Sequence, residues 1–392
     1  MEKLSDQGRL RPWMGFVLFG VLMAFFIVVC APLQEKLGIT GLLITEFSFL
    51  AIAVVYCLIR KVKIREVFPV KKVKAREVFG SLLLVLGAFP VSLVLVALSG
   101  TIFPWSTKEV GELSSFIYGS LNYPLAVLVI ALLPAICEEA IHRGAILSSF
   151  RSLKHDWLIV LIMGLFFGIN HMSFLRFLPT MFLGMVLSYV VVKRNNIVLS
   201  MLIHFTNNFI SVTISYLFGD TSSVSASFID YSSLIGGYLV FAFASPILIT
   251  LGMMLVNPEG HKKIRFLYAG ILSAVMFVSG IALNVITSQK NTLLNTNFSY
   301  EVTADDKDFS IGFTAEEDCK ATVVVVLVNA EGDYNVRIDG DKGSNIINAP
   351  VSQGMFRTLT YNVELQKDNY TVTIEPSDNA VGERPQIQIT VK

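Results

Sequence analysis

Nine long apolar segments occupy most of the first 290 residues of this 392-residue chain. A helix needs roughly 20 apolar residues to cross a hydrocarbon core that is about 30 Å thick. Most of the segments reach that length, although the fifth and the sixth are short. We therefore predict a polytopic all-α membrane domain with about nine transmembrane helices. The segments cover residues 13–33, 39–58, 81–103, 123–147, 157–172, 178–192, 197–218, 234–256 and 266–287.

Lys and Arg are concentrated in alternate loops between these segments. One set of loops holds 18 basic residues and the other set holds three. Because basic residues in short loops favour the cytosolic side, we predict a multi-pass protein of the cell membrane with a cytosolic N-terminus. After nine crossings, its C-terminus would be extracytoplasmic. The basic loops are 1–12, 59–80, 148–157, 193–196 and 256–265, and the three basic residues of the other set are Lys36, Lys108 and Arg176.

The composition excludes several classes of protein and divides the chain in two. Hydrophobic residues make up 53% and charged residues 16% of the chain, which excludes an ordinary cytosolic enzyme or a disordered protein. A net charge of +1 gives no support to nucleic-acid binding. Residues 288–392 nevertheless carry a net charge of −7, and the residues before them carry +8. Such a break in charge is typical of a domain boundary.

Seven short β-rich segments lie in the acidic part, and several of them alternate apolar with polar residues, as half-buried strands do. We predict a small extracytoplasmic domain of β-sandwich type, which either binds an extracellular partner or is an inert appendage. Its one cysteine, Cys319, precludes an internal disulfide. The segments are Phe298–Ala304, Phe309–Ala315, Ala321–Asn329, Asn335–Asp339, Met355–Leu365, Tyr370–Glu375 and Gln386–Val391.

The fourth apolar segment contains a group of ionisable residues, Glu138, Glu139, His142 and Arg143. A charged side chain at membrane depth costs at least about 2.5–3.5 kcal/mol, so such residues are functional candidates. Residues four apart lie on nearly the same side of a helix, so Arg143 should pair with Glu139, and His142 should share a stripe with Glu138. Glu138 is then the acid that the arginine does not neutralise. The alternative is a buried salt-bridge cluster that only fixes the register of the helix.

Two other apolar segments contribute histidines, His171 in the fifth and His204 in the seventh, where Asn208 follows four residues later. Their depths along the helices allow them to meet Glu138 in one cavity, which we expect to open toward the cytosol. Glu138 could then take a proton from water with the help of His171. His204 and Asn208 could donate hydrogen bonds to the oxyanion of a tetrahedral intermediate.

A second arrangement of the same residues involves a metal. Glu138, His171 and His204 form a two-histidine, one-carboxylate set, which could hold a divalent ion such as zinc with a bound water. The HExxH signature of soluble zinc proteases is absent. Both arrangements would hydrolyse an amide bond, and the residues alone do not choose between them.

The three motifs together resemble those of a known family. Glu-Glu-x-x-x-Arg at 138–143, Phe-x-x-x-His at 167–171 and His-x-x-x-Asn at 204–208 look like the motifs of the CAAX protease and bacteriocin-processing (CPBP) family. That family includes the type II CAAX prenyl endopeptidases (Ras-converting enzymes) and the prokaryotic Abi proteins. The resemblance covers residues 80–220 approximately. It implies a hydrolase, an intramembrane protease that is usually classed as a metalloprotease, although a metal-free glutamate mechanism has been argued.

Carried over residue by residue, the resemblance assigns roles within the membrane. Glu138 and His171 would activate water, and His204 and Asn208 would form the oxyanion site. Glu139 and Arg143 would complete the first motif and support it. We therefore predict a bacterial intramembrane endopeptidase that cleaves a membrane-associated peptide or protein near the cytosolic leaflet.

These predictions divide the chain into four parts. Residues 1–80 hold two helices and a basic loop, 81–220 the catalytic core, 221–290 the last helices, and 291–392 the β-rich domain. Two other functions stay open. One is a non-enzymatic bacteriocin-immunity or scaffolding protein, and the other is a proton-coupled transporter. Two further ionisable residues near membrane depth, Glu46 and Arg176, could line a substrate path or pair with polar neighbours.

Overall fold

The computed structural model describes residues 10–106, 121–218, 231–260, 263–290, 292–304, 307–343, 345–351 and 357–391. The chain forms two compact units. The described residues before 219, together with 231–283, form a helical unit. The residues from Asn284 onward form a second unit, so the last helix crosses from one unit into the other.

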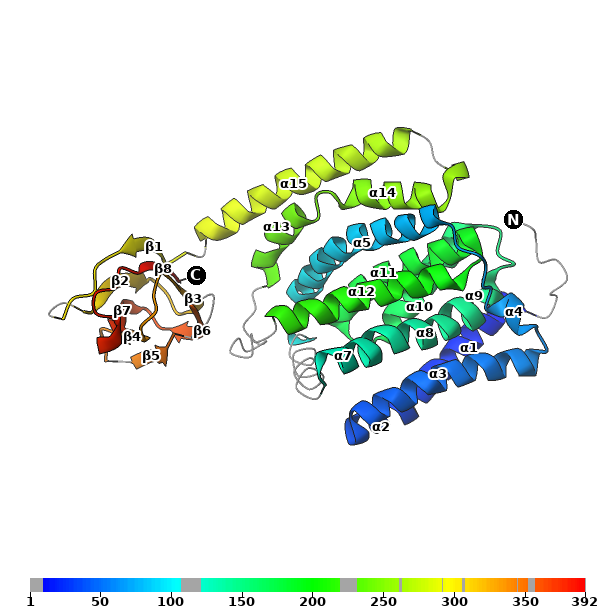
Figure 1. Ribbon diagram of the computed structural model, residues 1–392, viewed down its shortest axis with the longest axis horizontal. Coiled ribbons are helices and arrows are strands. Elements are labelled where there is room, and N and C mark those ends of the chain that lie inside the picture. Colours follow the sequence, from blue (N-terminus) through cyan, green and yellow to red (C-terminus); the bar gives the residue numbers. More distant parts are fainter. Residues whose placement is uncertain are drawn as a thin grey trace. The chain divides into compact units, whose positions relative to one another are not determined.

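The helical unit follows the order of the apolar segments (Figure 1). Several helices begin with proline at their first or second position, where its fixed φ and missing N–H cost nothing. The elements are α1 (Pro12–Phe25), η1 (Phe26–Cys30), α2 (Ala31–Leu37), α3 (Ile39–Arg60), α4 (Ile64–Val67), α5 (Ala75–Ile102), η2 (Pro104–Ser106), α7 (Tyr123–Ala126), η3 (Val127–Leu132), α8 (Leu133–Glu139), η4 (Ala140–Ile146), α9 (Leu147–Phe150), α10 (Asp156–Asn170), α11 (Phe174–Arg194), α12 (Ile197–Phe218), α13 (Tyr231–Phe241), α14 (Ser245–Val256), η6 (Pro258–Gly260) and α15 (Ile264–Lys290).

All nine predicted apolar segments are helical, but not all of them have the length of a transmembrane span. In the described part of the chain, seven helices are long and apolar enough to cross a membrane. The predicted segment 234–256 is broken into α13 and α14, which meet at a bend of 54° and make an eighth candidate if they are taken together. The predicted segment 157–172 corresponds to α10, which has only 15 residues. At 1.5 Å per residue it is about 22 Å long, less than the hydrocarbon thickness.

Glycines allow the helices around the candidate site to approach closely. A Cβ at Gly184 of α11 would lie 2.7 Å from Cβ of Phe167 on α10, and one at Gly164 would lie 2.9 Å from the Met181 carbonyl. Small residues at such contacts let backbones meet when no hydrophobic effect drives association. The contact of α10 with α11 sets the position of Phe167, around which the polar residues gather.

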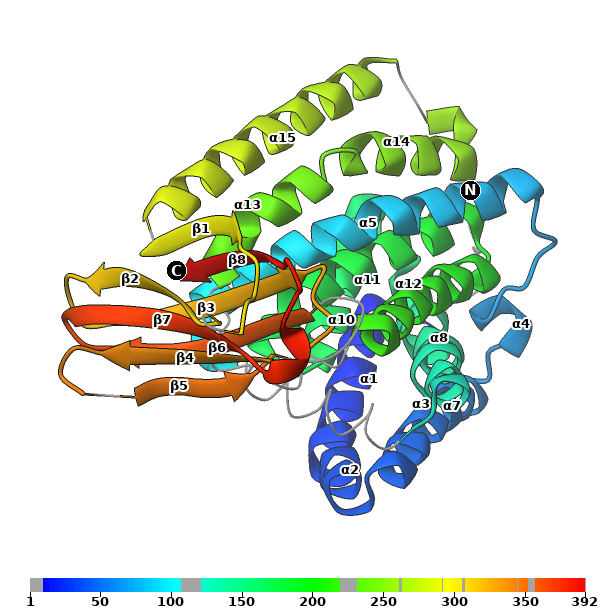
Figure 2. The same cartoon turned by 60° about the vertical axis from the view of Figure 1, so that its left-hand side comes forward.

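The described residues of the second unit form an all-β sandwich with eight strands in two antiparallel sheets (Figure 2). One sheet has the order β1-β8-β3-β6 and the other β2-β7-β4-β5. Alternate side chains of both sheets meet in one hydrophobic core, for example Val325 of β3, Ile389 of β8 and Val372 of β7. The strands are β1 (Leu294–Ser299), β2 (Phe309–Ala315), β3 (Cys319–Val328), β4 (Tyr334–Gly340), β5 (Asn345–Pro350), β6 (Arg357–Leu365), β7 (Asp368–Pro376) and β8 (Gln386–Val391).

The sequence predicted most of these strands and was wrong about two. The first strand lies at Leu294–Ser299 rather than at 298–304, because its pairing with β8 outweighs the low β-propensity of its asparagines. Strand β5 was missed, since Asn345–Pro350 has the composition of a turn. Within its sheet β5 pairs with β4 alone, an edge position that tolerates proline. The predicted start of the fifth β-rich segment, at 355–356, lies outside the described residues.

Candidate active site

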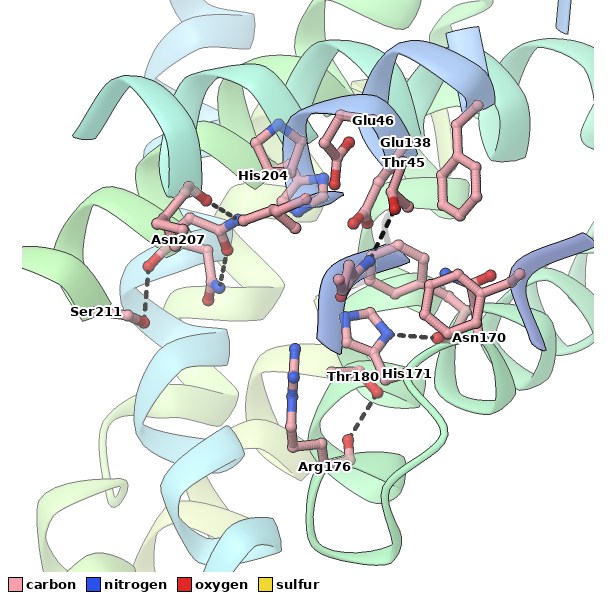
Figure 3. Close-up of a pocket in the computed structure, with 18 of the residues that line it drawn as sticks. Thr45, Glu46, Glu138, Asn170, His171, Arg176, Thr180, His204, Asn207 and Ser211 are labelled. Atoms are coloured by element: carbon pink, nitrogen blue, oxygen red, sulfur yellow. Dashed lines mark hydrogen bonds between the residues drawn. The ribbon is translucent and has the colours of Figure 1, made fainter. Parts of the chain in front are cut away.

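A cavity of about 640 Å³ lies inside the helical unit and is shown in Figure 3. The α2–α3 turn and α3 form one side, the ends of α10, α11 and α12 form the other, and η3 and α8 run along it. Its wall combines apolar and polar side chains, and the polar ones come from six helices. These polar residues are Gln34, Glu35, Thr45, Glu46, Glu138, Asn170, His171, Arg176, Thr180, His204, Asn207, Asn208 and Ser211.

The helix with two consecutive acids directs them to different places. It is α-helical from Leu133 to Glu139 and widens to a π-helix in η3 before it and in η4 after it. Glu138 is half-buried and lines the cavity, and its Oε2 is enclosed without a hydrogen-bond partner. Glu139 is fully buried and points away from the cavity toward α11 and α12. π-helical turns are rare and are frequent at functional sites.

Behind the cavity, Glu139 is the centre of a buried ionic network. Nη1 of Arg143 donates to Oε1 of Glu139 at 2.7 Å, which confirms the pairing predicted from their spacing. Nδ1 of His204 lies 3.1 Å from the same oxygen. Arg143 also donates to the Gly184 carbonyl at 3.2 Å, and its guanidinium lies over the ring of Phe167 at 4.2 Å. A buried charge needs such partners to offset its loss of water.

His171 lies at the C-terminal end of α10, just before Met172 turns the chain with a positive φ of 46°. Its Nδ1 is 2.8 Å from the Phe167 carbonyl. Because a carbonyl can only accept, Nδ1 carries the hydrogen, and in the neutral ring Nε2 has a free lone pair. The ring lines the cavity, so it can accept a hydrogen bond from a water molecule there.

α12 presents a polar face to the cavity. His204 and Asn208 both line it, as their spacing of four residues predicts. Nδ1 of His204 contacts Glu139, which leaves Nε2 as the second ring nitrogen. Nδ2 of Asn208 donates to the Ile130 carbonyl at 3.1 Å, and Oδ1 of Asn208 accepts from Asn207 at 3.2 Å. The amide of Asn208 is therefore held on both sides and keeps one N–H hydrogen uncommitted.

The structure thus brings the side chains of Glu138, His171, His204 and Asn208 to one cavity. Glu139 and Arg143 lie behind the wall, where they contact His204 and Gly184. His142 does not join Glu138 on the cavity wall as the helical spacing predicts. It is fully buried beside Phe167, with ring centroids 5.3 Å apart. The π-helical geometry of η4 accounts for the difference, because it changes the angular spacing of residues after Glu139.

The cavity extends away from the basic loops, contrary to the expectation of an opening beside them. α3 and α11 line it with the halves away from those loops, residues 39–49 and 176–183, and α12 lines it with its middle, residues 204–212. These halves lie next to the α2–α3 turn, where the exposed Glu35 is at the cavity edge. The basic loops 59–80 and 193–196 are at the opposite ends of the same helices. If the basic loops are cytosolic, the cavity therefore does not open toward the cytosol as the sequence predicted.

The end with the basic loops is closed by packing and by polar contacts. Phe150, Met163 and Val191 belong to a buried hydrophobic cluster between the cavity and these loops. Lys193 contacts Asp156 at 2.8 Å, and Nδ2 of Asn196 donates to the Lys71 carbonyl at 3.0 Å. Access from this end would require the packed side chains to separate, whereas at the α2–α3 end the exposed Glu35 lines the cavity.

The metal centre predicted from Glu138, His171 and His204 stays a prediction. Across the residues that the structure describes, no three His, Cys, Asp or Glu side chains are placed to hold one metal ion. Nδ1 of His171 is engaged with a backbone carbonyl and Nδ1 of His204 with Glu139, so each ring keeps one nitrogen for the cavity. That free nitrogen could serve either a metal ion or a water molecule.

Two residues that line the cavity, Glu46 and Asn207, are not among the defining residues of the three sequence motifs. Glu46 on α3 is 3% exposed and lines the cavity, and its Oε2 has no partner. Asn207 also lines the cavity and donates to Asn208. A carboxylate in an apolar helix is a signal that the sequence does carry. The position of Asn207 depends on how α12 is rotated, which its sequence does not fix.

Part of the chain matches the model of a known family. No curated protein matches the chain. Residues 120–210 match the family model described as "Type II CAAX prenyl endopeptidase Rce1-like". The matched stretch runs from the start of α7 to the middle of α12 and contains all six predicted site residues. It confirms the resemblance that the three motifs predicted: this part of the chain is similar to the type II CAAX prenyl endopeptidases, a family of proteases.

Proposed function

We propose that the helical unit is an intramembrane endopeptidase, which hydrolyses a peptide bond of a membrane-associated peptide or protein. One observation carries the proposal. Side chains from three helices far apart in the sequence, namely a carboxylate, two imidazoles and an amide, line one cavity within an apolar bundle. Burying such groups in a membrane costs free energy, so their presence there indicates a function. The family match supports protease chemistry for that function.

In the proposed reaction, Glu138 acts as the general base. Its unpartnered Oε2 accepts a proton from a water molecule, which Nε2 of His171 orients by accepting the second hydrogen. The oxygen of that water attacks the carbonyl carbon of the scissile bond. General base catalysis of this kind contributes about 10²–10⁴-fold to a rate.

The negative charge of the tetrahedral intermediate falls on the former carbonyl oxygen. The uncommitted N–H of Asn208 donates to it, and Asn207 and the Ile130 carbonyl hold that amide in place. His204 contributes Nε2, which donates when the ring is protonated, while Glu139 fixes the ring through Nδ1. Pre-oriented donors of this type lower the barrier without rearrangement during the reaction.

The direction from which the substrate arrives follows from the topology that we propose. The loops with 18 basic residues would be cytosolic, and the second unit would be extracytoplasmic. The cavity is lined by the halves of α3 and α11 that lie away from those loops, next to the exposed Glu35. A substrate would then reach Glu138 from the extracytoplasmic half of the membrane, and not from the cytosolic leaflet as the sequence suggested.

Replacing Glu138 by Gln tests the proposal, because the amide keeps the shape of the side chain and cannot take up a proton. We expect Glu138→Gln to lose at least about 10²-fold of the hydrolysis rate on a peptide cleaved by the wild-type protein. Unfolding in detergent should stay unchanged, since Oε2 has no partner to lose. Glu259→Gln, at an exposed position of η6 outside the lining of the cavity, is the matched control. Full activity of Glu138→Gln would overturn the proposed function.

A further inference from the structure

Glu46 is a buried carboxylate of the cavity that the proposed mechanism does not use. It lies on α3, outside the residues that match the protease family model. It is 3% exposed, lines the cavity, and its Oε2 has no hydrogen-bond partner. A carboxylate enclosed in this way needs a compensating partner or a function, because its transfer from water is costly.

The carboxyl group of Glu46 faces that of Glu138. α3 packs directly on α8, and the two carboxyl groups interact electrostatically. Figure 3 shows both side chains directed into the same part of the cavity. Two carboxylates at close range in a poorly hydrated site do not both ionise, and such a pair holds one proton. This contrasts with Glu139, whose charge is balanced by Arg143.

The other ionisable groups around Glu46 leave this proton with the pair. Two thiols lie within electrostatic range on neighbouring helices, Cys30 of η1 and Cys137 of α8. The basic groups that line the same cavity are His171, Arg176 and His204, and Glu139 already engages Nδ1 of His204. A thiol is a weaker acid than a carboxylic acid, so neither cysteine transfers its proton to the pair of Glu46 and Glu138.

We propose that Glu46 is a second catalytic residue, the acid that protonates the leaving amine; this inference rests on the proposed function. In the resting site Glu46 is protonated and Glu138 is ionised. Glu138 takes a proton from water as the hydroxide adds to the carbonyl carbon. When the C–N bond breaks, the amine nitrogen takes the proton of Glu46. A proton then passes from Glu138 to Glu46, which restores the pair and leaves one amine and one carboxylic acid as products.

The nature of the leaving group separates this role from a structural one. An amine leaves only when it is protonated, whereas the alkoxide of an ester leaves more readily without a proton. We would select from a library a fluorescence-quenched ten-residue peptide that the wild-type protein cleaves in detergent micelles. Its matched depsipeptide carries an ester in place of the cleaved amide. Glu46→Gln should lower amide hydrolysis by about 10²–10⁴-fold and should lower ester hydrolysis far less.

Three further variants complete the experiment. Glu259→Gln changes an exposed carboxylate of η6 outside the lining of the cavity and should leave both rates unchanged. Glu46→Asp keeps the acid and should retain part of the amide activity. Glu138→Gln should lose both activities. The dependence on pH gives a second readout, because loss of the acid should remove the alkaline limb of the amide profile and keep the acidic limb.

The outcomes distinguish the two proposals. Equal losses of amide and ester hydrolysis in Glu46→Gln, or no loss, would overturn the role of Glu46 and leave the protease in place. Retained activity in Glu138→Gln, or no peptide cleaved by the wild-type protein, would overturn the proposed function and this inference with it.

Discussion

The polar side chains around α8 form two regions with opposite surroundings, although Glu138 and Glu139 are consecutive in the chain. Behind the cavity, Arg143 and His204 both contact Oε1 of Glu139 in a fully buried network. On the cavity wall, Oε2 of Glu138 and Oε2 of Glu46 have no partner. Consecutive residues of a helix differ by about 100° around its axis, so one helix can serve both regions.

This difference separates groups that hold the bundle together from groups that are free to react. Arg143 links α8 to α11 through the Gly184 carbonyl, and His204 links it to α12 through Glu139. Both contacts are held inside the bundle, and of these groups only Nε2 of His204 is left for the cavity. The carboxyl groups of the wall, by contrast, are held mainly by the packing of their helices. We therefore expect changes behind the cavity to affect folding and changes on the wall to affect catalysis.

Replacing Arg143 by Met should have the largest effect on stability. The variant leaves the carboxylate of Glu139 buried without its cation, and breaking a buried pair in this way costs about 3–5 kcal/mol. The measurement is thermal unfolding of the purified protein in detergent. Arg65→Met, which changes an exposed arginine on α4, is the control and should unfold like the wild type.

A double variant sharpens this test. Adding Glu139→Gln to Arg143→Met removes the unpaired charge, so it should recover part of the lost stability. An Arg143→Met protein that unfolds like the wild type would show that the network does not hold the bundle. The distinction between the two regions would then fail.

The fold was largely predictable from the sequence because the membrane imposes a single requirement on it. Each apolar segment must satisfy its own backbone hydrogen bonds, so each becomes a helix. The break between α13 and α14 was not predictable, because the apolar character continues through Phe241–Ser245. Strand β5 was missed since its pairing with β4, and not its own composition, makes it a strand.

The site was predictable only where local spacing decides the contacts. The Glu139–Arg143 pair follows from a spacing of four residues, and His204 and Asn208 share a face for the same reason. The place of His142 was wrong because η4 is π-helical. The side on which the cavity opens, and the approach of Glu46 to Glu138, depend on how whole helices pack. That information is spread over many contacts and is absent from any short motif.

The two histidines beside Phe167 offer a smaller and more specific test of the two regions. His171 lines the cavity, whereas His142 is fully buried and has no hydrogen-bond partner at either ring nitrogen. His171→Phe should lower peptide hydrolysis by about 10²-fold, because the attacking water loses its acceptor. His142→Phe should keep hydrolysis near the wild-type rate. Initial rates on the selected peptide check both, and equal losses in the two variants would contradict the assignment of His171.

The β-sandwich supplies a carboxylate that is paired like Glu139, and there we expect the smallest effect. Glu383 accepts hydrogen bonds from the N–H of Gly332 at 2.6 Å and from the hydroxyl of Tyr334 at 2.7 Å. Burial, and then the contact with Glu383, raise the pKa of Tyr334 above that of a free tyrosine. Folded Tyr334 therefore keeps its proton at a pH where the unfolded chain, with a tyrosine pKa of about 10, has lost it.

The sign of the resulting pH dependence follows directly. The stability contributed by neutral Tyr334 is complete below about pH 10 and falls above it, by at most about 1.4 kcal/mol per pH unit. Urea unfolding of a fragment with residues 284–392, followed by circular dichroism from pH 8 to 11, should show a steeper decline for the wild type than for Tyr334→Phe. Tyr361→Phe, at an exposed position on β6, should decline like the wild type. Parallel curves for Tyr334→Phe and the wild type would show that the contact with Glu383 does not hold the tyrosine neutral. The paired carboxylate of Glu383 would then differ from that of Glu139 behind the cavity.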